Sequence, residues 1–252
     1  MPRYPRVEDD DYDWPQYVSV GERRRKAERE AARLGEASPV VLKGSRIANT
    51  FWGKAWCENL ERYSDYANRL PRGRTYVRSG CVVDLKIGSG TVKALVSGSR
   101  VYDVEVKVSP IPNVRWKAVC QDCAGAIDSL VELLEGRFSK PTMERLCQEK
   151  TGMFPLPTEM KFSCSCPDSA RMCKHIAAVL YGIGARLDEK PQLLFTLRNV
   201  DQQDLITKAG SRLTKPKTAR LLETDSLSDL FGIDIAEPKR RRKPRRRTRK
   251  GS

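Results

Sequence analysis

Four residues whose side chains bind transition metals lie within twelve positions of one another in the second half of the chain. They are Cys164, Cys166, Cys173 and His175. Their spacing is Cys-x-Cys, six residues, then Cys-x-His, and zinc favours thiolate and imidazole ligands in tetrahedral sites. His175 is the only histidine in the chain, so chance is a poor explanation of its place beside three cysteines. We therefore expect one zinc ion per chain at these residues.

The segments that flank these residues can bring them together. An alternating apolar pattern over 160–164 predicts a strand that ends at the first pair, and the apolar run 176–181 predicts a helix that begins at the second pair. A helix N-terminus stabilises thiolates. Protein would fill all four positions around the ion, so the site is expected to be structural, without room for a catalytic water. Three nearby cations would offset its negative charge: Lys161, Arg171 and Lys174.

The preceding residues predict an α+β fold. A helix is expected from a cap at Asn49 or Thr50 to about Ala67, before Pro71. Alternating patterns over 81–87, 91–96 and 102–108, separated by Gly-containing turns, predict a three-stranded antiparallel meander. The sequence thus predicts a small sheet with packed helices and a zinc-stapled strand and helix.

Two more helices are expected between the meander and the cysteine cluster. Apolar residues on one helical face over 116–134 predict a helix with Asn113 as its cap and Gly136 as its stop. Ser139 and Pro141 open a shorter helix that ends before position 152.

Changes of composition divide the chain into five regions. We expect an acidic and charged extension, disordered or an exposed helix, at 1–44, an α+β region at 45–158, a zinc module at 159–190, helical segments at 191–235 and a disordered basic tail at 236–252.

The remaining cysteines are interpreted first as packing residues. Cys120 and Cys123 share the apolar face of the helix at 116–134, where small sulfur side chains fill a core. A redox pair, or a second metal site that also uses Cys147, stays open as an alternative. Cys57 and Cys81 are likewise expected in the core.

The net charge of +15 is concentrated at the C-terminus. Ten cations without an acid lie between positions 239 and 250: Lys239, Arg240, Arg241, Arg242, Lys243, Arg245, Arg246, Arg247, Arg249 and Lys250. Such a run predicts nucleic-acid contact through phosphates. An import signal and a solvated chain end are the alternative interpretations of this basic run. The short apolar segment 225–232 could instead dock on the core or on a partner protein.

Catalytic and membrane functions find little support. The chain has no phosphate-binding loop and no Gly-x-Ser-x-Gly motif, and its one histidine is assigned to zinc, so we expect no enzyme. No apolar stretch is long enough for a membrane span, and an export signal is not apparent. The expected location is cytoplasmic, or nuclear in a eukaryotic host.

The metal-binding pattern resembles the SWIM zinc-finger family over about residues 160–187. Three further segments, at 51–56 (FWGKAW), 69–74 (RLPRGR) and 180–188 (LYGIGARLD), are similar to bacterial SWIM zinc-finger proteins, a resemblance that covers most of 45–235. It implies a zinc-stabilised fold, a DNA- or protein-binding role, and association with SWI/SNF-type helicase-like ATPases. The leading hypothesis is a non-enzymatic DNA-binding protein, and the second is an adaptor for such an ATPase.

Overall fold

The computed structural model of the protein describes residues 18–63 and 68–210. The basic tail and the segment 225–232 lie outside the described residues. The helices are α1 (Val20–Arg33), α2 (Phe51–Glu61), α3 (Leu70–Arg78), α4 (Asn113–Asp122), α5 (Leu130–Glu135), α6 (Lys140–Cys147), α7 (Lys174–Glu189), α8 (Gln192–Arg198) and α9 (Gln203–Gly210). The strands are β1 (Val82–Gly88), β2 (Thr91–Ser97), β3 (Val101–Val108) and β4 (Met160–Cys164).

The four strands form one antiparallel sheet in the order β1-β2-β3-β4, which confirms the predicted α+β fold and meander. Strand β4 pairs with β3, far from it in sequence, with Val104 opposite Cys164 and Val108 opposite Met160. This pairing holds the first cysteine of the cluster at the end of a rigid strand.

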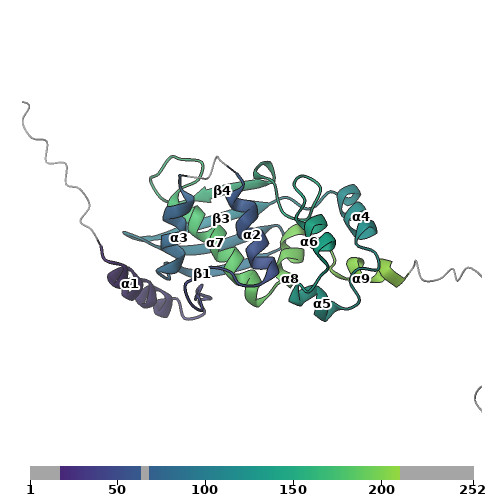
Figure 1. Ribbon diagram of the computed structural model, residues 1–252. Helices are drawn as coiled ribbons and strands as arrows, with labels where there is room; N and C mark the ends of the chain where they lie inside the picture. The colour runs from purple at the N-terminus through teal and green to yellow at the C-terminus, as the bar shows by residue number, and fades with distance from the viewer. Residues whose placement is uncertain (1–17, 64–67, 211–252) are drawn as a thin grey trace, which may run out of the picture. The chain divides into compact units, whose positions relative to one another are not determined.

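Helix α7 lies against one face of the sheet, and α2 and α3 pack on α7 (Figure 1). The α7 side chains are buried almost throughout. Two indole N–H groups fix α2: Trp56 donates to the carbonyl of Leu180 at 2.8 Å, and Trp52 donates to the carbonyl of Leu133 at 2.9 Å. A side chain at Gly73 would overlap Ala177, so this glycine lets α3 approach α7 closely.

Helix α1 lies in the extension 1–44, which was expected to be disordered or an exposed helix. Ser19 and Glu22 make a capping box at its start. The helix is not wholly exposed, because Ala27 is buried and Lys26 Nζ donates to the carbonyls of Gly98 and Ser99 at 2.7 Å each. These contacts tie α1 to the turn between β2 and β3.

The helix predicted from Asn49 to Ala67 is shorter, since α2 ends at Glu61. Thr50 holds the cap position, as predicted, but its side chain makes no capping bond; the carboxylate of Asp188 in α7 accepts from the Thr50 N–H at 3.0 Å. Pro71 does not simply follow a helix but lies in the first turn of α3, which was not predicted. Proline suits both places, so sequence alone left the choice open.

The single helix predicted over 116–134 is wrong, because the segment divides into α4 and α5. Gly125 takes a left-handed φ of 77° between them, and Ser129 caps α5 by accepting from the Glu132 N–H. Pro112, not Asn113, holds the cap position of α4. The predicted stop at Gly136 is confirmed, with a left-handed φ of 68°. The cap of α6 at Ser139 is also confirmed.

Among the described residues, no helix combines the length and apolar character that crossing a bilayer requires.

Candidate metal centre

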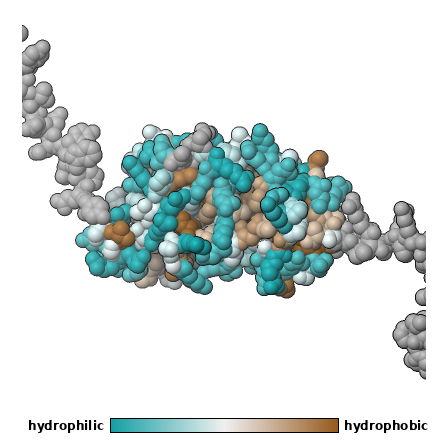
Figure 2. All heavy atoms as spheres, in the orientation of Figure 1, coloured by the Kyte–Doolittle hydropathy of each residue, from teal (hydrophilic) through white to brown (hydrophobic). Residues whose placement is uncertain are grey.

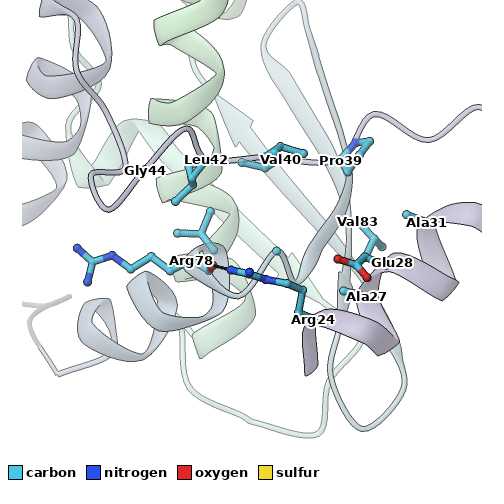
Figure 3. A pocket seen from close by; sticks show the side chains of 13 residues that line it. Arg24, Ala27, Glu28, Ala31, Pro39, Val40, Leu42, Gly44, Arg78 and Val83 are labelled. Carbon is cyan, nitrogen blue, oxygen red and sulfur yellow. Dashed lines mark hydrogen bonds between the residues drawn. The ribbon is translucent and has the colours of Figure 1, made fainter. Parts of the chain in front are cut away.

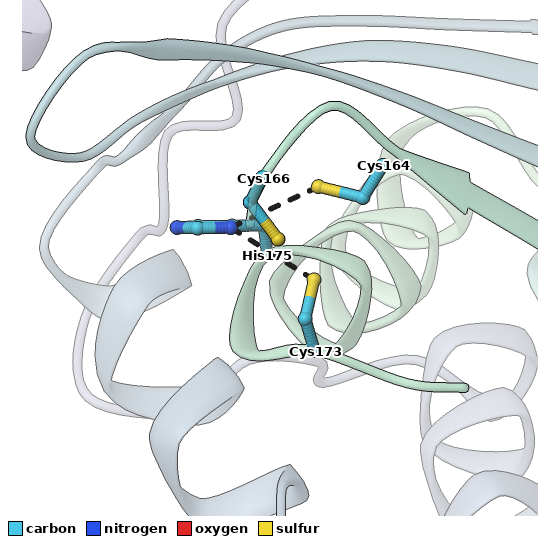
Figure 4. A group of neighbouring side chains, drawn as sticks. All are labelled: Cys164, Cys166, Cys173 and His175. Carbon is cyan, nitrogen blue, oxygen red and sulfur yellow. Dashed lines mark hydrogen bonds between the residues drawn. The ribbon is translucent and has the colours of Figure 1, made fainter. Parts of the chain in front are cut away.

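The structure brings the four predicted ligands together at the junction of β4 and α7 (Figure 4). Cys164 ends β4 and Cys166 follows in the loop, while Cys173 caps α7 and His175 lies in its first turn. Their ligand atoms all lie within 4.8 Å of one another. The Nδ1 atom of His175 is 3.8 Å from the sulfurs of both Cys164 and Cys173.

This donor set fits a zinc ion. A tetrahedral ion with Zn–S bonds of about 2.3 Å and Zn–N bonds of about 2.0 Å separates its ligand atoms by roughly 3.5–3.8 Å. The two separations between His175 Nδ1 and a sulfur are 3.8 Å, slightly longer than the roughly 3.5 Å of an N–Zn–S pair, so a small inward movement of the side chains would close the site on the ion. The four residues are therefore positioned to bind one zinc ion, as predicted. Zinc held in this way supplies a cross-link between β4 and α7, and the four protein ligands leave no position for a substrate.

Burial favours a neutral histidine in this site. His175 is only 3% exposed, and removal from water lowers its pKa to about 4, with a smaller contribution from the neighbouring Lys174. Burial also raises the pKa values of the Cys164 and Cys173 thiols in the metal-free protein. A buried cluster of thiols therefore needs a cation to become thiolates, which the metal would provide.

Two tyrosines that sequence analysis did not single out hold the imidazole in place. The ring of Tyr102 in β3 stacks on His175 with 4.3 Å between centroids, and Tyr76 in α3 contacts it edge-on at 5.5 Å. The second ring nitrogen of His175, Nε2, is buried without a hydrogen-bond partner. Aromatic packing, not a hydrogen bond, thus orients this ligand, and no local sequence pattern could have revealed it.

The loop that carries the cysteines is fixed at both ends. Ser165 pairs with Asp103: its N–H donates to the Asp103 carbonyl, and its Oγ accepts from the Asp103 N–H, both at 3.0 Å. Further along, Asp168 forms an ion pair of 3.4 Å with Arg69 before α3. Lys174 is one of the three cations expected to offset the negative charge of the zinc ligands. Its ammonium group lies over the ring of Tyr76.

Cys120 and Cys123 lie in the core, with exposed fractions of 0% and 1%. Burial raises the pKa of Cys123 to about 11, which opposes the thiolate that redox chemistry needs. Among residues 18–63 and 68–210, the cluster at 164–175 is the one group of histidine, cysteine and acidic side chains close enough to share a metal. Cys81 is buried and Cys57 is partly buried, in line with the packing interpretation.

Comparison with known proteins agrees with this geometry. The family model of the SWIM zinc finger matches residues 159–182, so the chain carries a SWIM zinc finger. Over 168 residues it is 32% identical to the uncharacterized protein Rv2102 of Mycobacterium tuberculosis. The match covers 66% of this chain and 60% of that protein, so the chain spans less than two thirds of this relative. No solved structure matches the chain.

Proposed function

We propose that the protein is a non-enzymatic DNA-binding protein whose zinc finger has a structural role. The observation that carries this proposal is the run of ten cations and no acid between Lys239 and Lys250. Such a segment can neutralise several phosphates and release the counterions around DNA. Contacts to phosphates carry no sequence information, so such a segment would supply affinity without sequence preference.

The zinc centre supports a binding role more than a catalytic one. Its four protein ligands would occupy every coordination position of a tetrahedral zinc ion, and one of them is the only histidine of the chain. We therefore assign the metal to holding β4 and α7 together.

The proposal is tested by a salt titration of the full chain and a chain truncated after Glu237, on two unrelated duplexes. We expect the truncation to weaken binding to both duplexes by a similar factor. The slope of log affinity against log salt should fall by about 0.9 for each phosphate contact that is lost. Equal slopes for the two chains would show that the tail does not contact the phosphates.

An adaptor for a SWI/SNF-type helicase-like ATPase is the second candidate function. Its support is the resemblance to bacterial SWIM proteins and the short apolar segment 225–232. Affinity purification of the native protein with and without nuclease separates the two functions. A partner ATPase that is retained after nuclease treatment, and without the tail, would favour the adaptor.

A further inference from the structure

A basic hollow lies on the side of the molecule that α2 and α3 form, where hydrophilic residues predominate (Figure 2). It has a volume of about 220 Å³. Four cations line it, from the segment before α2, from α2 and from α3: Arg46, Lys54, Arg74 and Arg78. Glu58, Glu61 and the phenol of Tyr181 complete its polar lining. We call this the α2–α3 hollow.

One cation of the hollow is already engaged. Arg74 forms an ion pair with Glu61 and donates to the Tyr181 hydroxyl at 3.0 Å, while that hydroxyl donates to Glu61 at 2.8 Å. This closed set of three groups explains Arg74 as a structural residue. It also neutralises Glu61, so that Glu58 is the one acid left to balance the other cations of the hollow.

The other three cations have no acidic partner within 4 Å among the described residues. Arg46, Lys54 and Arg78 are exposed, as is Arg72, which lies outside the hollow, six residues before Arg78 on α3. The guanidinium of Arg78 points away from the neighbouring hollow beneath α1, where only its carbonyl is used, as acceptor for Arg24 (Figure 3). These side chains therefore remain available to an anion in solution.

One charge of α3 works against the stability of that helix. Its nine residues contain no acid, and Arg72 lies in the first turn, where the helix dipole disfavours a cation. Arg78 lies in the last turn, where the dipole favours a cation, and Arg74 is paired with Glu61. Packing accounts for Leu70, Gly73 and Val77, which are buried, but not for the exposed Arg72. A binding role would explain why an unfavourable cation occurs at this position.

We propose that the α2–α3 hollow and Arg72 bind the phosphate backbone of duplex DNA. This inference rests on the proposed DNA-binding function and adds a second contact surface, on the folded domain, to the tail. Guanidinium groups offer a planar fork of N–H donors that matches phosphate oxygens. Cations spread over two helices suit a line of phosphates, whereas the centre of a protein interface is depleted of charge.

The zinc finger holds this surface in position. Helix α3 meets α7 at Gly73 and Ala177, its first turn follows the Arg69–Asp168 ion pair, and Tyr76 contacts His175. The metal centre at the start of α7 is thus linked to the helix that carries Arg72 and Arg78. The zinc would act on DNA binding by fixing α3, without touching the DNA.

The test uses the full-length, zinc-loaded chain in three forms: unaltered, Arg72→Gln/Arg78→Gln, and Lys93→Gln/Lys117→Gln. The last pair is the matched control, since both lysines are exposed, on β2 and α4, and neither lines the hollow. Each double variant removes two charges. Each variant is folded if its zinc content and the urea concentration at its unfolding midpoint match those of the unaltered chain.

We expect Arg72→Gln/Arg78→Gln to weaken binding to a short DNA duplex and to lower the salt slope by about 0.9 per contact, or roughly 1.8 for two. The lysine control should change neither quantity, and Arg72→Lys/Arg78→Lys should restore most of the slope. Equal effects of the arginine and lysine variants would overturn the inference, because general charge would then explain them.

A further arm distinguishes the inference from the function on which it rests. Replacing the tail cations by glutamine could abolish duplex binding while the arginine variant binds like the unaltered chain. The inference about the hollow would then be wrong and the proposed DNA-binding function would stand. If the unaltered chain does not bind the duplex, both the inference and the proposed function are wrong. A loss of binding to poly-glutamate but not to DNA would assign the hollow to an acidic protein instead.

Discussion

The imidazole of His175 stacks on the phenol ring of Tyr102, with 4.3 Å between the ring centroids and 24° between the ring planes. Tyr102 belongs to β3 and His175 to α7, so the contact joins the sheet to the helix at the metal centre. The tyrosine hydroxyl is also fixed, 2.6 Å from Ser99 Oγ. Tyr102 therefore restricts the direction from which Nδ1 meets the ion.

Replacing Tyr102 by leucine should weaken zinc binding, because His175 would lose the ring that orients it. Loss of groups that orient metal ligands typically costs about 10–100-fold in affinity, and we expect an effect in this range. Competition with a chelator measures it. Tyr102→Phe is the matched control, since it keeps the stacked ring and loses only the contact with Ser99. A similar loss in both variants would assign the effect to the hydroxyl.

The purified protein should hold about one equivalent of zinc, and Cys173→Ser should lose it. Structural zinc contributes on the order of 10 kcal/mol in small fingers, and α7 is the buried helix on which the sheet, α2 and α3 pack. The variant should therefore become sensitive to protease first in the loop between β4 and α7. Metal analysis and limited proteolysis measure these effects. Cys147→Ser, a cysteine outside the cluster, should keep the metal and the protease pattern. Unchanged proteolysis of Cys173→Ser would contradict a structural role.

Zinc affinity should rise with pH because the ligand thiols must lose their protons. Burial raises the pKa values of Cys164 and Cys173, so these thiols are protonated near neutral pH in the metal-free protein. The lowered pKa of His175, about 4, means that the imidazole is already neutral there. We expect roughly three protons released per zinc, one from each cysteine ligand. An indicator dye in weak buffer measures them. Release of a fourth proton on zinc binding near pH 6.5 would mean that His175 is protonated there, which would contradict the burial that lowers its pKa.

Cys120→Ala/Cys123→Ala should leave the zinc content unchanged. Both side chains are buried in the core, so their loss should lower the free energy of unfolding by roughly 1 kcal/mol at each site, a usual size for point substitutions. Urea unfolding and metal analysis measure the two quantities together. Loss of a second metal equivalent in the double variant would restore the alternative of a second site.

Glu159→Gln should destabilise the protein strongly. The carboxylate pairs with Arg198 at 3.1 Å and with Arg115 at 2.6 Å, and Arg198 is fully buried. An amide would leave the Arg198 charge without a counter-charge, and breaking buried pairs costs roughly 3–5 kcal/mol. Urea unfolding measures the loss. Glu189→Gln, which removes the exposed partner of Arg186, is the control and should cost less than about 1 kcal/mol.

Features that depend on residues close together in the chain could be predicted from the sequence. The zinc ligands lie within twelve positions, so their types and spacing identified them before any fold was known. The alternation that predicts the meander, the helix start at Ser139 and the helix stop at Gly136 are local in the same sense, because each reports on the conformation of its own segment. Pro71 marks the limit of such patterns, since proline can end one helix or begin the next.

Contacts between distant segments could not be predicted in this way. Tyr102 is 73 residues from His175, and its stacking depends on the pairing of β3 with β4 and on the packing of α7 on the sheet. Asp188 caps α2 from the end of α7. Arg46, Lys54 and Arg78 line one hollow because α3 packs against α7 through Gly73. Contacts of this kind arise from shape and packing among segments that local patterns do not compare, and so they become visible only in the folded chain.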